Sequence, residues 1–318
     1  MSVSERENKA TAAACDLHCD LLSYLAAREG RDLYNEESRC ALPQLKRGGV
    51  SFQALAIFCE TKKGSTHSGL KQLAAFQAFC PSFAKEGIKV ALALENASTF
   101  AEEGESLEEV FLRFERFQKV AAPLYVSLTW NTENRFGGGN ASSIGLKRDG
   151  EALLTYLSGQ GIAIDLSHTS DALAIDVMEF IDKKALKLKL LASHSNFRKV
   201  RDHKRNLPCD IASEIIRRKG LVGINLFRAF VGDKFSTNLI EMIEHGLCLG
   251  GENALCFGAD FFCDTDFSTA LSYTPPFFHE AFSNASCYPK IQHLLTPYFP
   301  SEIIEKIFYA NVLSFLRK

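Results

Sequence analysis

Eight short apolar runs recur along the chain, and each has the length of a single β-strand. Several of them are apolar at every position instead of alternating with polar residues, which is typical of strands that are covered on both faces. The runs lie at 13–17, 52–58, 88–94, 124–129, 162–166, 189–192, 221–226 and 254–257.

Most of the intervals between these runs hold segments with the apolar spacing of amphipathic helices, for example at 70–80, 107–120 and 172–186. Pro81 is expected to end the first of these helices, because proline has no N–H to donate within a helix. A strand followed by a helix, repeated eight times at roughly 30 to 40 residues per unit, is the layout of a TIM (β/α)8 barrel.

An open, doubly wound parallel sheet is the structural alternative. Such a sheet usually has fewer strands and a glycine-rich phosphate loop after the first strand, and the residues Leu17-His18-Cys19-Asp20 do not form one. We therefore expect one barrel domain over residues 1–318, with residues 1–12 as a flexible N-terminal segment.

Composition adds limits to this picture. The chain has 318 residues, of which 46% are hydrophobic, and its formal net charge of -2 gives no reason to expect a nucleic acid or an anionic membrane as partner. The first residues lack the apolar region of a signal peptide, and no run is long enough to span a bilayer, so a cytoplasmic protein is expected. The ten cysteines are scattered without a CxxC pair, which favours reduced, buried thiols.

Histidines and carboxylates stand at the C-terminal ends of five of the predicted strands. In a strand, residues i and i+2 point to the same side, so His18 and Asp20 would reach into one place while Cys19 points away. Each candidate alone is ambiguous, because a carboxylate after an apolar run is often only the solvated start of a loop. The set consists of His18, Asp20, Glu95, His168, His194 and Asp260.

The position of these six residues removes much of the ambiguity. They follow the first, third, fifth, sixth and eighth runs, and barrel enzymes place their sites at this end of the strands. Three histidines and three carboxylates are the ligand set expected for two divalent ions such as zinc. The sequence therefore predicts a metal site at the C-terminal mouth of the barrel.

Several segments resemble the renal (membrane) dipeptidase family in order and approximate spacing, and the resemblance extends from about Asp16 to the segment at 311–313. The segments are Asp16-Leu17-His18-Cys19-Asp20, Ile164-Asp165-Leu166-Ser167-His168, Ser193-His194-Ser195, Arg205-Asn206-Leu207-Pro208 and Phe257-Gly258-Ala259-Asp260. The resemblance implies a TIM barrel with two zinc ions. Members of the family often form dimers, so a homodimer is expected by analogy.

The resemblance also implies a role for each site residue. His18 and Asp20 would bind one ion, and His168 and His194 would bind the other. Glu95 would bridge both ions. Asp260 would handle protons, and Arg205 would hold the carboxylate of the substrate.

One position departs from the family pattern. The family has Leu-Thr-His after the fourth strand, and that histidine contacts the substrate carbonyl, whereas this chain has Leu128-Thr129-Trp130. Trp130 cannot donate a hydrogen bond in the same way. Its indole N–H could replace the histidine in part, or the ring could form a wall of the substrate pocket.

The function implied by the resemblance is that of a metal-dependent dipeptidase. Two ions would lower the pKa of a bridging water, so that hydroxide is present near neutral pH to attack the peptide bond. Two alternatives stay open. The same metal site could hydrolyse another amide, such as an N-acyl amino acid or a cyclic amide, or the barrel could have lost activity and serve as a binding or scaffold protein.

Overall fold

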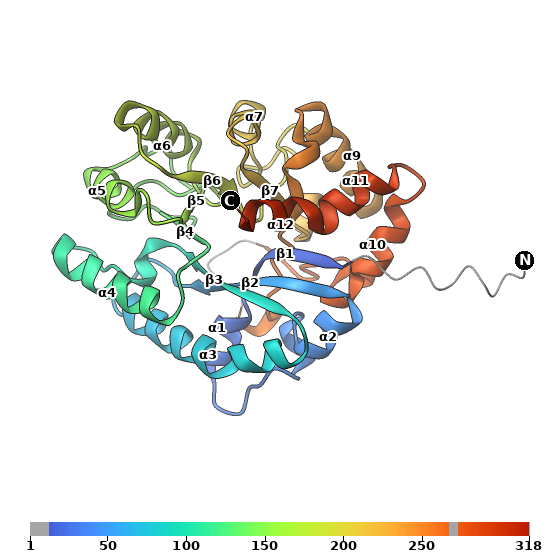
Figure 1. Ribbon diagram of the computed structural model, residues 1–318, viewed down its shortest axis with the longest axis horizontal. Coiled ribbons are helices and arrows are strands. Elements are labelled where there is room, and N and C mark those ends of the chain that lie inside the picture. Colours follow the sequence, from blue (N-terminus) through green and yellow to red (C-terminus); the bar gives the residue numbers. More distant parts are fainter. Residues whose placement is uncertain (1–12, 267–272, 318) are drawn as a thin grey trace, which may run out of the picture.

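The structure is a computed structural model, and it describes residues 13–266 and 273–317. The segment at 1–12 that we expected to be flexible lies outside the described residues. Eight parallel strands close into a barrel in the order of the chain (Figure 1). The TIM barrel is therefore confirmed, and the open sheet is wrong because the first strand also pairs with the eighth, through Asp16 and Phe257.

All eight predicted strands are present, with boundaries that differ by a few residues. They are β1 (Ala14–Cys19), β2 (Val50–Phe58), β3 (Lys89–Glu95), β4 (Tyr125–Ser127), β5 (Ala163–Asp165), β6 (Lys189–Ala192), β7 (Leu221–Ile224) and β8 (Leu255–Phe257). Several strands are shorter than their apolar runs. The end of the fourth run, for example, is buried but no longer pairs in the sheet, because Leu128 lies in the loop that follows β4.

Helices surround the barrel and follow the strands in turn (Figure 1). They are α1 (Leu21–Ala27), α2 (Leu42–Arg47), α3 (Ser65–Lys85), α4 (Leu107–Val120), α5 (Arg148–Leu157), α6 (Asp171–Lys184), α7 (Cys209–Arg217), α8 (Arg228–Val231), α9 (Phe235–Cys248), α10 (Tyr288–Leu295), α11 (Ser301–Glu305) and α12 (Asn311–Leu316).

The helix α3 does not end at Pro81, which corrects the prediction. It continues through Pro81 to Lys85. Proline removes one helical hydrogen bond, but Phe83, two residues further on, is fully buried in the core. The burial of this aromatic ring outweighs the lost hydrogen bond and holds the last turn in place.

The inside of the barrel is filled by side chains from all eight strands. Phe52 and Ala54 of β2 lie in this inner cluster, whereas Leu55 and Ile57 belong to the core between the strands and the helices. The inner cluster consists of Cys15, Leu17, Phe52, Ala54, Ala93, Tyr125, Ala163, Leu191, Leu221 and Cys256. Val312 and Phe315 of α12 pack against it, so α12 covers one end of the barrel (Figure 1).

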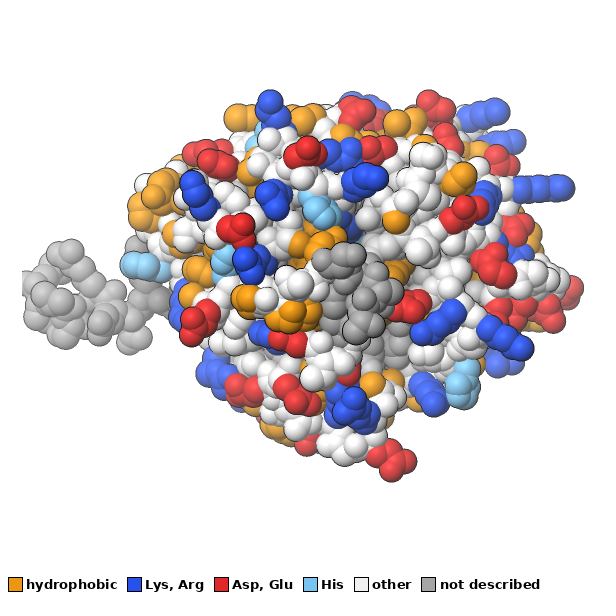
Figure 2. All heavy atoms as spheres, turned by 180° about the vertical axis from the view of Figure 1, so that it is seen from behind, with side chains coloured by type: hydrophobic (Ala, Val, Ile, Leu, Met, Phe, Trp, Pro, Cys, Tyr) orange, Lys and Arg blue, Asp and Glu red, His pale blue; other side chains and the backbone are white. Residues whose placement is uncertain are grey.

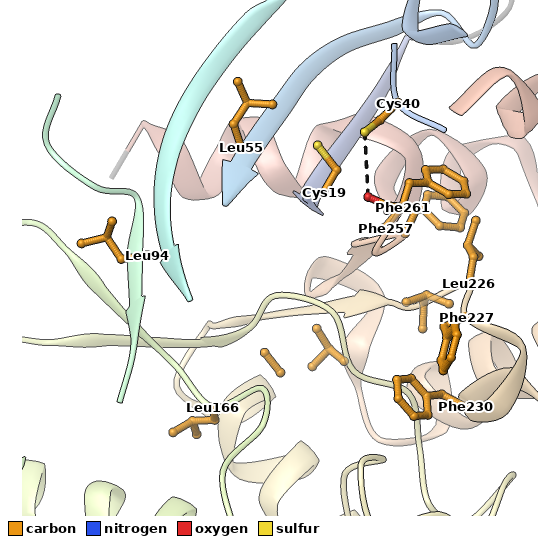
Figure 3. Close-up of a cluster of buried hydrophobic side chains, with 14 of the residues drawn as sticks. Cys19, Cys40, Leu55, Leu94, Leu166, Leu226, Phe227, Phe230, Phe257 and Phe261 are labelled. Atoms are coloured by element: carbon orange, nitrogen blue, oxygen red, sulfur yellow. Dashed lines mark hydrogen bonds between the residues drawn. The ribbon is translucent and has the colours of Figure 1, made fainter. Parts of the chain in front are cut away.

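The cysteines form no disulfide, and seven of the ten are buried. Cys19 points into the core beside Cys40, whose thiol lies 3.8 Å from the carbonyl oxygen of Phe261 (Figure 3). Cys19 thus points away from the barrel mouth, as predicted from its place between His18 and Asp20.

Acidic and basic side chains are interspersed over the face opposite the one in Figure 1 (Figure 2). Among the described residues, no helix combines the length and the apolar character that crossing a membrane requires.

Candidate active site

The six predicted side chains meet at the C-terminal mouth of the barrel. The Nε2 atom of His18 lies 3.4 Å from Glu95 Oε2, 3.7 Å from Asp260 Oδ1 and 3.9 Å from Asp20 Oδ1. On the other side of Glu95, its Oε1 atom lies 2.9 Å from His168 Nε2 and 3.5 Å from His194 Nε2. Residues from five strands therefore form one buried cluster, which we call the mouth cluster.

A local irregularity of β1 turns His18 into the mouth. The pairing between β1 and β2 shifts register between Asp16 and Cys19. The carboxylate of Asp16 accepts hydrogen bonds from the backbone N–H groups of His18 and Ala259, both at 3.0 Å, and from the hydroxyl of Tyr288. Asp16 thus replaces ladder hydrogen bonds at the point where the strand changes direction, as side-chain acceptors do at a β-bulge.

The second half of the cluster follows β5 and β6. His168 has a positive φ of 66°, and the Nε2 atoms of His168 and His194 are 2.9 Å apart. The glycine run Gly137-Gly138-Gly139 packs behind His168, where the N–H of Asn140 donates to the carbonyl of His168 at 2.9 Å. A Cβ atom at Gly139 would lie 2.0 Å from the carbonyl oxygen of Trp130, so this loop requires glycine for its close approach.

Asp260 completes the cluster from the end of β8. It also has a positive φ, of 65°, and its Oδ2 atom accepts a hydrogen bond from the side chain of Asn225 at 2.8 Å. The other oxygen, Oδ1, faces His18. Burial and the nearby charge of Glu95 raise the pKa of Asp260 to about 6, against the opposing effects of His18 and Arg205.

The charges of the mouth cluster favour a cation at its centre. Burial by itself lowers the pKa of His18, but the carboxylates of Glu95, Asp20 and Asp260 outweigh it and raise that pKa to about 10. Burial and the nearby Arg205 lower the pKa of His168 to about 3. Burial and the nearby charges of His18 and Arg205 also hold the pKa of His194 well below its usual value. The neutral imidazoles of His168 and His194 and three carboxylates thus surround a position where positive charge is stabilised.

The mouth cluster also fits metal ions by its unused ligand atoms. His18 Nε2 and Asp20 Oδ1 are buried without a hydrogen-bond partner, which is costly unless another group such as a cation satisfies them. Three groups of residues could each hold an ion, because the ligand atoms within each group lie within 4.8 Å of one another. The groups are His18-Asp20-Glu95, Glu95-His168-His194 and His18-His194-Asp260. Glu95 is shared by the first two groups, with one oxygen toward each.

Each histidine of the cluster is held from behind by a residue that the sequence reasoning missed. His18 Nδ1 lies 2.7 Å from the hydroxyl of Tyr125, and His168 Nδ1 lies 2.7 Å from the side-chain oxygen of Asn131. His194 Nδ1 lies 2.6 Å from Ser193 Oγ. Such contacts fix the orientation of metal-binding imidazoles.

Asp165 is a fully buried support residue behind the mouth cluster. Its carboxylate accepts hydrogen bonds from Ser193 Oγ at 2.7 Å and Ser127 Oγ at 2.9 Å, and from the backbone N–H groups of Ser167 and Ser193. Asp165 therefore supports His194 through Ser193.

A cavity of about 150 Å³ opens above the mouth cluster. Aromatic rings form much of its wall, and Asp20, Glu95, His168 and Asp260 lie at its base. Trp130 is part of the wall, with its ring centre 4.8 Å from that of Phe58 and 5.9 Å from that of His168. The position of Trp130 therefore matches the pocket wall among the two readings of this residue.

Arg205 lies beside the mouth cluster but is deeply buried, with 3% of its surface exposed. Its guanidinium donates to Ser195 Oγ at 2.7 Å and to the carbonyl oxygen of His194 at 3.0 Å, while its Nε atom is buried without a partner. The side chain of His203 accepts a hydrogen bond from the backbone N–H of Arg205 at 3.1 Å. Arg205 thus holds the loop that carries His194, and its unused N–H groups are the ones left for a ligand.

The structure thus defines a class of protein: a TIM barrel that carries a candidate metal centre, built from buried histidines and carboxylates, at the C-terminal mouth of its strands. The sequence pattern of the membrane dipeptidase family (peptidase family M19) matches residues 5–318. The chain belongs to this family.

Individual relatives agree with this assignment at low identity. The chain is 27% identical over 146 residues to Dipeptidase aclJ of Aspergillus oryzae, and this alignment covers 43% of this chain and 33% of that protein. It is 24% identical over 225 residues to Dipeptidase 3 of Macaca fascicularis, and this alignment covers 65% of this chain and 45% of that protein. The aligned parts thus span less than half of the length of these two relatives.

The fold agrees with a solved structure as well. A metallopeptidase from Rhodobacter sphaeroides, solved with a phosphinate mimic of the dipeptide L-Ala-D-Ala, superimposes with a TM-score of 0.78 at 17% identity. The superposition covers 97% of this chain and 99% of that one. This similarity supports the same barrel fold.

Proposed function

We propose that this protein is a metal-dependent dipeptidase with two zinc ions at the mouth cluster. The observation that carries the proposal is the position of Glu95, whose two oxygens face two separate sets of histidine and carboxylate ligands. His18 and Asp20 would hold one ion and His168 and His194 the other, with Glu95 shared. Metal ions held there would supply Lewis acidity toward a water molecule and the scissile carbonyl.

The residues of the chain itself would do the remaining work. Asp260 Oδ1 faces the cluster while Oδ2 is engaged by Asn225, so Oδ1 is the atom that would take a proton from the attacking water and return it to the leaving amine. The aromatic walls would exclude water from the cut bond. Arg205 would attract the C-terminal carboxylate of the substrate through its unused N–H groups.

A combined metal and turnover assay tests the proposal. The purified protein should contain close to two divalent ions per chain by elemental analysis. Removal of the metal with a chelator should abolish hydrolysis of simple dipeptides, and added zinc, cobalt or manganese should restore it. Hydrolysis that survives complete metal removal would show a different mechanism, and bound metal without turnover of any amide would favour a binding protein.

A further inference from the structure

The carboxylates that line the cavity are not all needed at the mouth cluster. Five of them line it, and the described lining residues include no lysine or arginine. Asp20, Glu95 and Asp260 belong to the cluster. Asp266 is held by the guanidinium of Arg31 through two hydrogen bonds, of 2.5 and 3.0 Å. The fifth carboxylate is Glu60.

Glu60 has only a weak partner within the described protein. Lys62 Nζ lies 3.2 Å from Glu60 Oε2, and the side chain of Lys62 is 67% exposed, whereas that of Glu60 is 32% exposed. A surface ion pair of this kind contributes little free energy, and it is easily exchanged for another cation. Glu60 is therefore available to a positively charged group inside the cavity.

The strand register places Glu60 above the mouth cluster. Phe58, the last residue of β2, is the register partner of Glu95 on β3. Phe58 and Glu60 both line the cavity, and Glu60 lies two residues further along the chain, about 6 to 7 Å outward if the chain stays extended. A carboxylate at this position faces the part of the cavity that lies directly above the proposed reacting centre.

Two aromatic rings line the same cavity as this carboxylate. The rings of Phe58 and Trp130 are tilted by 56° to each other, with their centres 4.8 Å apart, and Phe58 is two residues before Glu60 in the chain. A cation beside the face of a tryptophan or phenylalanine is attracted by the ring quadrupole. Trp130 stands where the family resemblance led us to expect a histidine, so the cavity has gained an aromatic face in place of a hydrogen-bonding imidazole.

We propose that Glu60, together with Phe58 and Trp130, binds the free α-amino group of the substrate and thereby selects dipeptides over N-acyl amino acids. The inference rests on the proposed dipeptidase function. In a dipeptide the amino nitrogen is only two bonds, about 2.5 Å, from the scissile carbonyl carbon. The ammonium group must therefore lie directly above the mouth cluster, in the layer that Glu60 faces.

Two substrates that differ only in the amino group test this selection. Alanylglycine carries the α-ammonium group, and propionylglycine is the same molecule without it. The metal-loaded wild-type protein should have a kcat/KM at least about tenfold higher for alanylglycine. Glu60→Gln should raise KM for alanylglycine by about tenfold or more with kcat within about twofold, and should leave the KM of propionylglycine unchanged. Where propionylglycine is not cleaved, its inhibition constant replaces KM.

The control is Glu86→Gln, which changes a similarly exposed carboxylate, 35% exposed and paired with Lys46, outside the cavity. It should alter neither substrate, and both variants should retain wild-type metal content. Equal use of the two substrates by the wild type, or an equal loss on both in Glu60→Gln, overturns the inference and leaves the hydrolase function standing. If the metal-loaded wild type cleaves neither compound nor any other dipeptide, the proposed function fails and this inference fails with it.

Discussion

Tyr125→Phe is the most direct test of how the protein prepares His18 as the proposed metal ligand. The hydroxyl of Tyr125 has one proton, which it donates to the carbonyl of Leu17 at 3.0 Å. We infer that the same oxygen accepts a hydrogen bond from His18 Nδ1, 2.7 Å away, so that Nδ1 carries the hydrogen. When a metal ion displaces the proton on Nε2, the lone pair of that atom, which faces the mouth cluster, becomes available to the ion.

The size of the effect follows from what the substitution removes. Phenylalanine fills the same space, so no cavity forms, but the N–H of His18 and the carbonyl of Leu17 lose a partner in a fully buried place. A buried group left unsatisfied costs about 1–3 kcal/mol, and loss of a partner behind a metal ligand typically weakens metal binding about 10- to 100-fold. We expect a loss of metal affinity in that range.

Competition with a chelator of known affinity measures this loss, and urea unfolding of the metal-free protein measures the stability. Tyr24→Phe is the matched control, because Tyr24 is equally buried but donates its hydroxyl hydrogen bond to Glu37, away from the mouth cluster. Unchanged metal affinity in Tyr125→Phe, or an equal loss in the control, would refute the argument that Tyr125 sets the form of His18.

Three further predictions concern other residues. Asp260→Asn should keep nearly all bound metal but reduce turnover by about 100- to 10,000-fold. Asp260 also lies in a group with His18 and His194 that could hold an ion, so a loss of metal in elemental analysis would show that Asp260 is a ligand instead. Arg205→Ala should raise KM about tenfold or more for dipeptides with a free carboxylate and hardly affect C-terminally amidated ones, whereas equal losses on both would mean that Arg205 only holds the His194 loop. Hydrogen bonds from Arg217 and Arg218 lower the pKa of Glu214 from 4.5 to about 2, so the stabilisation that they provide is present above pH 4.5 and is lost as the pH falls toward 2. Glu214→Gln should therefore destabilise the metal-free protein in urea at pH 6 more than at pH 3, and an equal effect at both pH values would contradict this.

The strand order and the side chains that follow the strands could be predicted because both depend on local patterns, although several strands end before their apolar runs do. Apolar runs covered on both faces identify parallel strands, and a ligand type directly after such a run, as with His194 after β6, marks the mouth of a barrel. The i, i+2 spacing of His18 and Asp20 was sufficient to place both on one side with Cys19 on the other.

The residues behind the ligands could not be predicted in this way. Tyr125 is an ordinary strand residue within an apolar run, and it is 107 positions away from His18 in the sequence. Only closure of the barrel brings these two side chains together. The only sequence signal for Ser193 and Asn131 was that both are polar and lie next to His194 and Trp130. Their role becomes clear only when one asks which group contacts the Nδ1 atom of each histidine and so sets its tautomer. The continuation of α3 past Pro81 likewise depends on a packing partner for Phe83.

The left-handed backbone at His168 and Asp260 sets stability against activity in this protein. Residues other than glycine lose roughly 1–2 kcal/mol in that conformation, and glycine avoids the cost. Both positions nevertheless carry large functional side chains at φ values of 66° and 65°. A directed-evolution experiment that selects for thermal stability alone should therefore tend to accumulate glycine at 168 and 260, whereas selection for turnover should retain the strained residues.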